Sequence, residues 1–349
     1  MTDPNPPRAR RPRRSCLSVP GVSTRYLDKA RGLPADHVFL DLEDSVPADH
    51  KTQARARVIA ALRAGGWQDK TVSVRVNEPL SPWAAHDVID VVEQAGSRLD
   101  AIMLPKTEEP AHLHWLDILL TQLERAEGLA PGRIAIEAHV ETARGVLAAP
   151  AIAAACGRTE AIVFGSGDYS ASVGMAHAEV GEPPPGYPAD AFHQPLTTIL
   201  LAARAHGLQA VDGAYFRIHD AAGFDRAAQA SAALGFDGKV VLHPAQIEAA
   251  NRVYVPTQAQ YEHAELVLEA HEYCSRELGL GAAMLGSQMI DEATRRVASM
   301  VVAKGRAAGL PRSRAFDPAT DLSRYARAGV RARDNGHRPD GDREAAAGA

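Results

Sequence analysis

Two acidic residues follow neighbouring apolar runs of the sequence and could bind a divalent ion together. Glu141 follows the run at 134–140, and Asp168 lies shortly after the run at 161–164. If both runs are adjacent strands, the carboxylates converge and repel each other unless a cation lies between them. Oxygen ligands with room for water and substrate suit Mg²⁺, with Mn²⁺ as a second candidate, and no His/Cys set is present for zinc. The pair therefore predicts a magnesium site, whereas either carboxylate alone could serve as a salt-bridge partner or a helix cap.

Further charged residues follow the other apolar runs. Glu43 and Asp44, in DLEDS, are expected to bind the waters of the metal, although Asp44 could instead cap the following helix. Arg75 lies within the run TVSVRV, where a buried guanidinium needs a negative partner. That partner is either a structural one, Glu43 or Glu141, or a substrate carboxylate or developing enolate oxygen. Lys106, in LPK, is expected to contact the substrate.

The elements that position these residues are short strands alternating with helices. The apolar runs lie at 15–20, 37–41, 71–76, 101–104, 134–140, 161–164, 209–212 and 239–242, with amphipathic segments between them. Most runs are almost continuously apolar, which is typical of strands that are buried on both faces. Eight such units predict an α/β fold, the TIM (β/α)₈ barrel, whose active site lies at the carboxyl ends of its strands.

The chain of 349 residues is expected to have four parts. Residues 1–14 are predicted to be a disordered basic arm, and 15–252 the catalytic barrel. Residues 253–312, with helices at 258–278 and 291–308, are predicted to form an additional C-terminal helical extension. Residues 313–349 are polar and predicted to be a disordered tail. The connection 169–193, which contains GEPPPGYP, is long enough to act as a lid.

Composition limits the environment and the partners. The net charge of −5 gives no overall attraction to nucleic acid or membrane, so neither is expected as a partner. No apolar window reaches the roughly 18 residues needed to span a bilayer, and no apolar segment of export-signal type follows the N-terminal arginines. The three cysteines are far apart and form no CxxC pair, which argues against a disulfide framework. We expect a cytoplasmic protein.

A series of motifs resembles a known family. RSCLSVPG, FLDLEDSVPADHK, VSVRVN, IMLPK, ETARGVL, FGSGDYSASVG, DGAYF, GFDGKVVLHPAQI and MIDEAT occur in this order over about residues 15–308. Together they resemble the citrate lyase β-subunit and malyl-CoA lyase family of the HpcH/HpaI aldolase superfamily. The resemblance implies a TIM-barrel lyase that cleaves or forms 3-hydroxyacyl-CoA thioesters, with malyl-CoA to glyoxylate and acetyl-CoA as the type reaction.

The resemblance also implies roles for individual residues. Glu141 and Asp168 would be the Mg²⁺ ligands, and Arg75 would stabilise the enolate of the CoA thioester. Asp291, in MIDEAT, would reach a neighbouring subunit's active site as an acid/base group, although the sequence alone predicts a helix N-cap there. This arrangement implies a homo-oligomer, a trimer or hexamer. Where many relatives have a GAADLA-type stretch, this chain has GSGDYSAS, which keeps Asp168 but changes its neighbours.

For the CoA thioester substrate the resemblance points to basic residues near the barrel mouth. Arg25 and Lys29 lie one turn apart in the first helical segment and could bind the CoA phosphates. Lys239 and His243 are expected to line the same cleft. The small-molecule partners are then an acyl-CoA and a 2-oxo acid.

Several alternatives stay open at this point. The same site could cleave citramalyl-CoA, belong to a citrate lyase β-subunit that acts on citryl-CoA, or hydrolyse malyl-CoA as a thioesterase. A class II aldolase acting on free 2-oxo acids would need no CoA. A non-catalytic binding subunit could retain the barrel, but the presence of Arg75, Glu141, Asp168 and Asp291 together argues against it.

Overall fold

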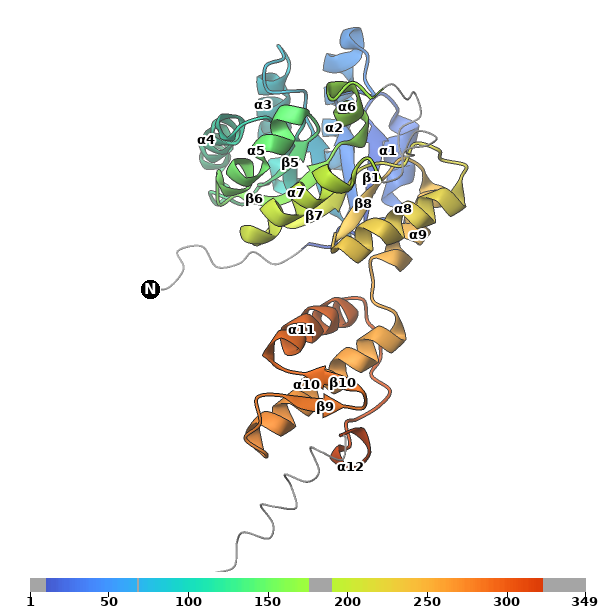
Figure 1. Ribbon diagram of the computed structural model, residues 1–349. Helices are drawn as coiled ribbons and strands as arrows, with labels where there is room; N and C mark the ends of the chain where they lie inside the picture. Colours follow the sequence, from blue (N-terminus) through green and yellow to red (C-terminus); the bar gives the residue numbers. More distant parts are fainter. Residues whose placement is uncertain (1–10, 68, 176–189, 323–349) are drawn as a thin grey trace, which may run out of the picture. The chain divides into compact units, whose positions relative to one another are not determined.

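Eight parallel strands form a closed barrel in chain order, with the first strand paired to the eighth (Figure 1). The structure is a computed structural model that describes residues 11–67, 69–175 and 190–322. The strands are β1 (Ser15–Pro20), β2 (His37–Asp41), β3 (Thr71–Arg75), β4 (Ala101–Leu104), β5 (Ala135–Val140), β6 (Thr159–Phe164), β7 (Gln209–Asp212) and β8 (Gly238–Val241). The predicted (β/α)₈ barrel is therefore confirmed.

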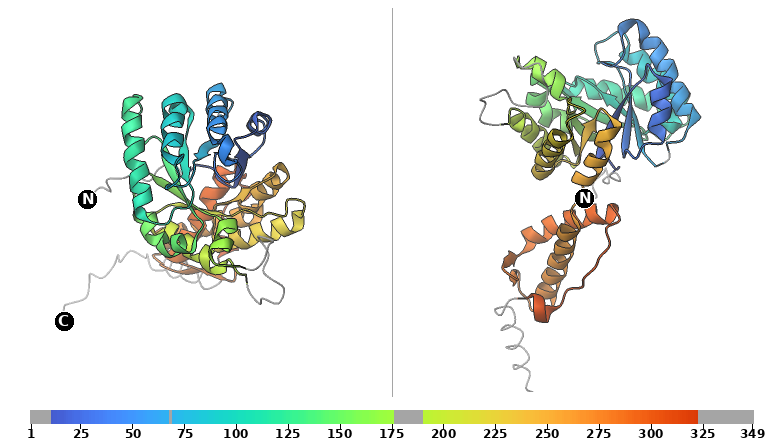
Figure 2. Two further views of the ribbon diagram at one scale, coloured as in Figure 1. Left: turned by 90° about the horizontal axis from the view of Figure 1, so that it is seen from above. Right: turned by 90° about the vertical axis from the view of Figure 1, so that its right-hand side faces the viewer.

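Helices surround the barrel, as the view from above in Figure 2 shows. They are α1 (Thr24–Arg31), α2 (Lys51–Ala64), α3 (Ala84–Ala95), α4 (Pro110–Ala126), α5 (Ala143–Ala154), α6 (Ser166–Ser172), α7 (His193–Ala205), α8 (Ala221–Leu234) and α9 (Ile247–Val253), with short 3₁₀ turns η1 (Ala48–His50), η2 (Gly96–Arg98) and η3 (Pro244–Gln246). The long connection expected at 169–193 is partly helical, because α6 and α7 extend into it. Its residues 176–189 lie outside the described residues.

The alternation of side chains along each strand separates two apolar layers. On β2, Val38 and Leu40 belong to the large cluster between strands and helices, whereas Phe39 belongs to a smaller cluster with Met103 and Val163. Successive side chains of a strand point to opposite faces, so the smaller cluster fills the barrel interior. The same alternation directs Asp41 to the interior, two residues after Phe39.

The N-terminal segment departs from the sequence-based prediction. We expected residues 1–14 to be a disordered arm, but Arg13 is fully buried and forms ion pairs with Glu137 (2.9 Å) and Glu160 (3.0 Å). Arg14 pairs with Asp36 at 2.6 Å, and Arg11 pairs with Glu160 at 3.1 Å. The prediction is wrong for residues 11–14, because carboxylates at the amino-terminal end of the barrel bind these arginines. Residues 1–10 lie outside the described residues.

A second unit begins after Tyr254, two residues beyond the expected boundary. Taken by itself, it contains two antiparallel strands and its own apolar core, to which Tyr261, Ile290 and Val302 belong. Its elements are α10 (Gln258–Arg276), β9 (Ala283–Leu285), β10 (Gln288–Ile290), α11 (Glu292–Ala307) and α12 (Pro318–Asp321). Both predicted C-terminal helices are therefore present.

The predicted disordered tail begins later than expected. We placed its start at residue 313, but α12 lies within that stretch and Leu322 is buried in the core of the second unit. The prediction is wrong for residues 313–322, and residues 323–349 lie outside the described residues. The apolar side chains Phe316 and Leu322 explain the difference, since both contact that core.

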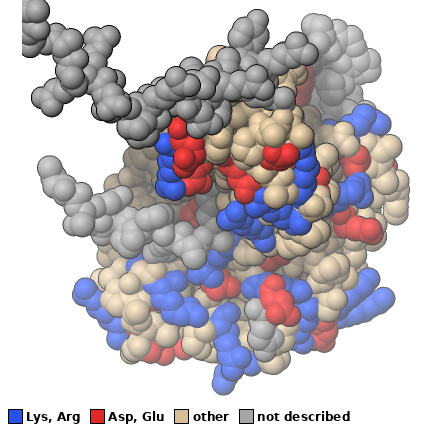
Figure 3. Space-filling view, turned by 90° about the horizontal axis from the view of Figure 1, so that it is seen from below, with Lys and Arg blue, Asp and Glu red and all other residues tan. Residues whose placement is uncertain are grey.

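Charged side chains are distributed over the molecular surface. Figure 3 shows Lys and Arg side chains interspersed with Asp and Glu side chains on one face. Among the described residues, no helix is both long and apolar enough to cross a bilayer.

Candidate active site

Arg75 is fixed at the carboxyl end of β3 by the neighbouring strand. Its Nε and Nη2 atoms donate hydrogen bonds to the two carboxylate oxygens of Asp41 at 2.7 and 2.8 Å. Burial alone would raise the pKa of Asp41, but the charge and hydrogen bonds of Arg75 outweigh it and lower this pKa to about 2. Asp41 and Arg75 are register partners of adjacent strands. This bidentate pair fixes the orientation of the guanidinium.

The loop after β2 brings two more carboxylates close to Arg75 and to Lys106. Glu43 Oε2 lies 3.2 Å from Arg75 Nη1, and the Lys106 ammonium donates a hydrogen bond to Glu43 Oε1. Asp44 Oδ1 is 3.5 Å from Lys106 Nζ. Burial, with the nearby Asp44 charge, raises the pKa of Glu43 to about 7 although Arg75 opposes it. Asp44 does not cap the following helix, whose N-cap is His50.

Lys51 supports this loop from the first turn of α2. Its buried ammonium donates hydrogen bonds to the backbone carbonyls of Leu42 (2.9 Å) and Glu43 (2.8 Å). The same ammonium lies over the ring of Trp83, 5.6 Å from its centroid. Lys51 therefore holds the backbone that carries Glu43 and Asp44.

Glu141 is a deeply buried carboxylate of the barrel mouth, with 1% of the residue exposed. The backbone N–H of Lys106 donates a hydrogen bond to its Oε1 at 2.8 Å. Gly165 makes room for it, because a Cβ on this residue would lie 2.3 Å from Glu141 Oε2. Burial raises the pKa of Glu141 well above its usual range, and the charges of Glu43 and Asp168 raise it further, whereas Arg75 opposes the shift.

His139 lies two residues before Glu141 on β5. Its Nδ1 is buried without a hydrogen-bond partner among the described residues and lies 3.4 Å from Glu141 Oε2. Burial and the nearby Arg75 lower the pKa of His139 to about 3. The imidazole is therefore neutral at ordinary pH, and the alternation along β5 places it on the same interior face as Glu141.

Asp168 lies in the first turn of α6, close to the same charged groups. About a third of its side chain is exposed, and its Oδ1 is 3.7 Å from Lys106 Nζ. Its charge affects the pKa of Glu141, so the two carboxylates interact electrostatically. Lys106 contacts both acids, Glu141 through its backbone N–H and Asp168 through its ammonium; that the two carboxylates share an ion stays a prediction.

The charges at the mouth suit a divalent cation. Among the described residues, five carboxylates, those of Asp41, Glu43, Asp44, Glu141 and Asp168, lie near three cationic side chains, Arg75, Lys106 and Lys51. Within the described ranges, no group of three or more His, Cys, Asp or Glu side chains is arranged so that it could hold a metal ion by itself. Two carboxylates with the remaining positions left to water or substrate match the preference of Mg²⁺ rather than that of zinc.

The residues expected to bind CoA lie in different environments. Arg25 and Lys29 are both exposed on α1, which begins four residues after β1 ends. His243 is the N-cap of η3, and its Nδ1 accepts a hydrogen bond from the backbone N–H of Ala245 at 3.2 Å. The exposed pair on α1 is compatible with phosphate binding, whereas His243 has a capping role in this structure.

Lys239 does not lie where we expected it. Only 4% of the residue is exposed, and its ammonium forms an ion pair with Asp212 at 2.5 Å. Its backbone N–H donates to the carbonyl of Arg14, at the amino-terminal end of the barrel. A buried, paired ammonium is not available to a CoA phosphate. The predicted CoA contact of Lys239 is therefore withdrawn.

Asp291 lies in the second unit and is the N-cap of α11. Its Oδ1 accepts a hydrogen bond from the backbone N–H of Thr294 at 2.9 Å, and the Thr294 hydroxyl donates back to it. The backbone hydrogen bond from Thr294 lowers the pKa of Asp291. The capping role inferred from the sequence is thus present, and the acid/base role stays a proposal.

Sequence reasoning assigned no role to Asp41, Lys51 or His139. A signal for Asp41 and His139 was available, because each lies two residues from a residue that was selected, Glu43 and Glu141. Alternate residues of a strand share a face, so both could have been placed in the barrel interior. No sequence signal indicated that Lys51 would reach back to the loop.

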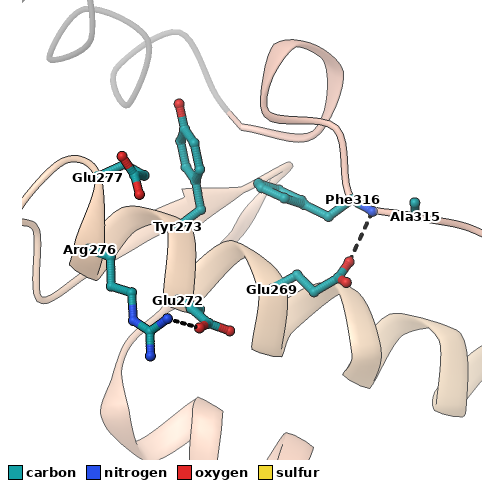
Figure 4. Close-up of a pocket in the computed structure, with 7 residues that line it drawn as sticks. All are labelled: Glu269, Glu272, Tyr273, Arg276, Glu277, Ala315 and Phe316. Atoms are coloured by element: carbon teal, nitrogen blue, oxygen red, sulfur yellow. Dashed lines mark hydrogen bonds and ion pairs between the residues drawn. The ribbon is translucent and has the colours of Figure 1, made fainter.

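Two surface grooves are lined by residues other than those of the barrel mouth. One, of about 310 Å³, is in the second unit and is shown in Figure 4, where Glu269 accepts a hydrogen bond from the backbone N–H of Phe316 and Arg276 pairs with Glu272. The other, of about 270 Å³, lies along α2 and α3. Neither is lined by the charged residues of the mouth, so neither is assigned to the reaction.

Comparison with known proteins places this site in a family context. Residues 14–244, which make up almost the whole barrel, match the family described as HpcH/HpaI aldolase/citrate lyase. The chain belongs to this family. An L-malyl-CoA/beta-methylmalyl-CoA lyase from Cereibacter sphaeroides is 36% identical, over 85% of this chain and 96% of that protein. The citrate lyase subunit beta of Escherichia coli is 33% identical, over 87% and 96%.

Two solved structures are also similar to this chain. Protein CitE from Mycobacterium tuberculosis, in complex with magnesium, acetoacetate and coenzyme A, has a TM-score of 0.66 and 29% identity, over 84% of this chain and 97% of that chain. A citrate lyase beta subunit from the same organism, complexed with oxaloacetate and magnesium, has a TM-score of 0.57 and 31% identity, over 69% and 96%. The family resemblance drawn from the motifs is therefore confirmed.

Proposed function

We propose that this chain is a Mg²⁺-dependent carbon–carbon lyase that cleaves or forms a 3-hydroxyacyl-CoA thioester of the malyl-CoA type, with glyoxylate and acetyl-CoA as products or reactants. The observation that carries the proposal is the buried Glu141 carboxylate, which accepts a hydrogen bond from the backbone N–H of Lys106, while the ammonium of that lysine lies 3.7 Å from Asp168. A buried carboxylate among other carboxylates needs a cation to stay ionised. Held by Glu141 and Asp168, Mg²⁺ would polarise the oxygens of the oxo acid as a Lewis acid.

The relatives support the substrate class. One is named for malyl-CoA and beta-methylmalyl-CoA, and a similar solved structure contains magnesium, acetoacetate and coenzyme A together. We carry the divalent ion, the small oxo acid and the CoA thioester over to this chain. Citryl-CoA cleavage as a citrate lyase β-subunit is the second candidate, because a citrate lyase subunit beta is 33% identical.

Arg75 would stabilise the charge that develops during cleavage. A guanidinium has five N–H donors, and Asp41 accepts hydrogen bonds from only two of them. When the carbon–carbon bond opens, negative charge moves to the thioester oxygen as an enolate. A cation fixed before the reaction lowers the free energy of that state without reorganising. Glu43 and Asp44 would face the waters of the ion, as the sequence-based hypothesis has it.

The proposal also assigns roles to Asp291, to the residues expected to bind CoA and to Lys106. Asp291 of a neighbouring subunit would protonate the enolate carbon, or remove that proton in the direction of synthesis. This role requires a homo-oligomer, for which a trimer or hexamer is our proposal. Arg25 and Lys29 would bind the CoA phosphates, and Lys106 a carboxylate or thioester group of the substrate.

A cytoplasmic location is also proposed, with which the three free cysteines agree.

A product analysis tests the reaction directly. The full chain is incubated with acetyl-CoA or propionyl-CoA, Mg²⁺ and a panel of 2-oxo acids, and the products are identified by mass. We expect malyl-CoA from acetyl-CoA and glyoxylate, and no product after chelation of the ion. If oxaloacetate were the only 2-oxo acid that reacted with acetyl-CoA, the citryl-CoA reaction would be favoured. Release of free malate would indicate a thioesterase. Condensation of free acids without CoA would contradict the proposal in favour of an aldolase.

A further inference from the structure

Lys106 has an unusual backbone conformation for its residue type. Its φ is 45°, and it is the one non-glycine residue with positive φ in the described part of the chain. Residues other than glycine, asparagine and aspartate rarely adopt a positive φ. Those that do are often found at functional sites. The surrounding contacts must therefore hold Lys106 in this conformation.

Contacts with β5 provide that restraint. The Lys106 N–H donates to Glu141 Oε1 at 2.8 Å, and the next residue, Thr107, donates its N–H to the carbonyl of His139 at 3.0 Å. The Thr107 hydroxyl also donates to the carbonyl of Leu104 at 2.9 Å. The turn after β4 is thus fixed against the strand that carries Glu141.

This conformation directs the Lys106 ammonium toward carboxylates from two other elements. Its Nζ donates to Glu43, lies 3.5 Å from Asp44 and lies 3.7 Å from Asp168. Only a quarter of its side chain is exposed, so solvent screens these charges incompletely. Asp168 is therefore in contact with a resident cation and is also one of the two acids assigned to the divalent ion.

We propose that the Lys106 ammonium is a built-in counter-ion that competes electrostatically with the divalent ion held by Glu141 and Asp168, and thereby lowers the affinity for that ion. The inference rests on the proposed function, because it takes these two carboxylates as the metal ligands. Two cations near one carboxylate repel each other, and the repulsion is large where solvent is partly excluded. Lys106 thus stabilises the mouth when no ion is bound and opposes ion binding.

Mn²⁺ binding to the full chain without substrate tests this competition. The free-ion signal in electron paramagnetic resonance gives the Kd for wild type, Lys106→Met and Lys106→Gln. Removing the ammonium should lower the Kd at least about tenfold. Lys106→Arg keeps the charge and should stay within about twofold of wild type. Lys70→Met is the matched control, because Lys70 precedes β3 at the opposite end of the strand from Arg75.

Thermal unfolding without metal gives a second readout for the same variants. Lys106→Met and Lys106→Gln should melt at lower temperature than Lys70→Met, because the carboxylates near residue 106 lose a counter-ion. Added Mn²⁺ should raise the melting temperature of these two variants more than that of wild type. An unchanged or higher Kd in both neutral variants would overturn the inference and leave the proposed function intact. If wild type itself bound no Mn²⁺, the proposed function and this inference would fall together. Lys106→Gln keeps the test valid if the methionine variant does not fold.

Discussion

At the scale of single residues, the barrel mouth contains more carboxylates than cations: five carboxylates lie near Arg75, Lys106 and Lys51. Arg75 donates hydrogen bonds to Asp41, and Lys106 donates one to Glu43. Glu141 accepts a hydrogen bond from a backbone N–H. The energetics of such a site depend on which carboxylates have a counter-charge. Asp41 is the one whose partner is firmly assigned, so its contribution to stability can be predicted.

The pair of Asp41 and Arg75 should make the stability of the barrel depend on acid pH. The pKa of Asp41 is about 2 in the folded chain, against about 3.9 for an exposed aspartate. Because folding lowers this pKa, the ionised carboxylate stabilises the fold at pH values above the pKa of the unfolded chain. That stabilisation is lost as the pH falls from about 4 to 2. The contribution is roughly 2 to 3 kcal/mol at pH 7.

Urea unfolding of wild type and Asp41→Asn at several pH values checks this. The variant should be less stable at pH 7, and the difference between the two proteins should shrink between about pH 4 and pH 2. Lys51→Met, which leaves the ion pair in place, is the comparison variant. A stability difference that stays constant down to pH 2 would contradict the assignment.

At the scale of elements, the N-terminal segment closes the end of the barrel opposite the active site. The backbone carbonyl of Arg13 lies against Gly238, where a Cβ would be only 1.7 Å from it. The Arg13 guanidinium is buried between Glu137 and Glu160. Residues 11–14 are therefore part of the barrel.

Arg13→Met should destabilise the barrel strongly. It leaves Glu137 buried without its main counter-charge, and breaking a buried ion pair in this way typically destabilises by about 3–5 kcal/mol. Arg14→Met is the matched control, because the Arg14 side chain is one-third exposed, and it should lose only about 1 kcal/mol. Chemical denaturation measures both values. Equal losses would show that Arg13 is not the structural anchor.

The strands could be predicted from the sequence because both of their faces are buried. In β2 and β3 every residue is buried, so the apolar runs themselves mark the bounds, and the strand ends then located Glu141 and Asp168. Arg13 could not be predicted, since a run of arginines is normally solvated and its partners lie more than a hundred residues away. Lys239 was misplaced for a related reason: a strand lysine looks available until its strand neighbour Asp212 is known.

At the scale of the whole molecule, the proposal divides the active site between two chains. The barrel carries Arg75, Glu141 and Asp168, whereas Asp291 belongs to the second unit, which begins after Tyr254. Most soluble oligomers are symmetric assemblies of one chain, so a site shared across an interface recurs in every subunit. Such a site can be tested by mixing two inactive variants.

Asp291→Ala and Glu141→Gln should each be almost inactive alone and regain activity when coexpressed. In a mixed oligomer, roughly a quarter of the sites would combine an intact barrel with an intact Asp291 from another subunit. Asp291→Ala should also keep Mn²⁺ binding, because Asp291 is not assigned to the metal. Absence of recovery in mixed oligomers of verified composition would contradict the shared site.

The central claim is that Glu141 and Asp168 hold a divalent ion at the mouth of the barrel. A crystal of the full chain grown with Mn²⁺ and glyoxylate, measured at a wavelength with manganese anomalous signal, tests it most directly. The account predicts one anomalous peak coordinated by both carboxylates, and its loss in Glu141→Gln. Carboxylates that point away from each other, with no peak between them, would contradict it.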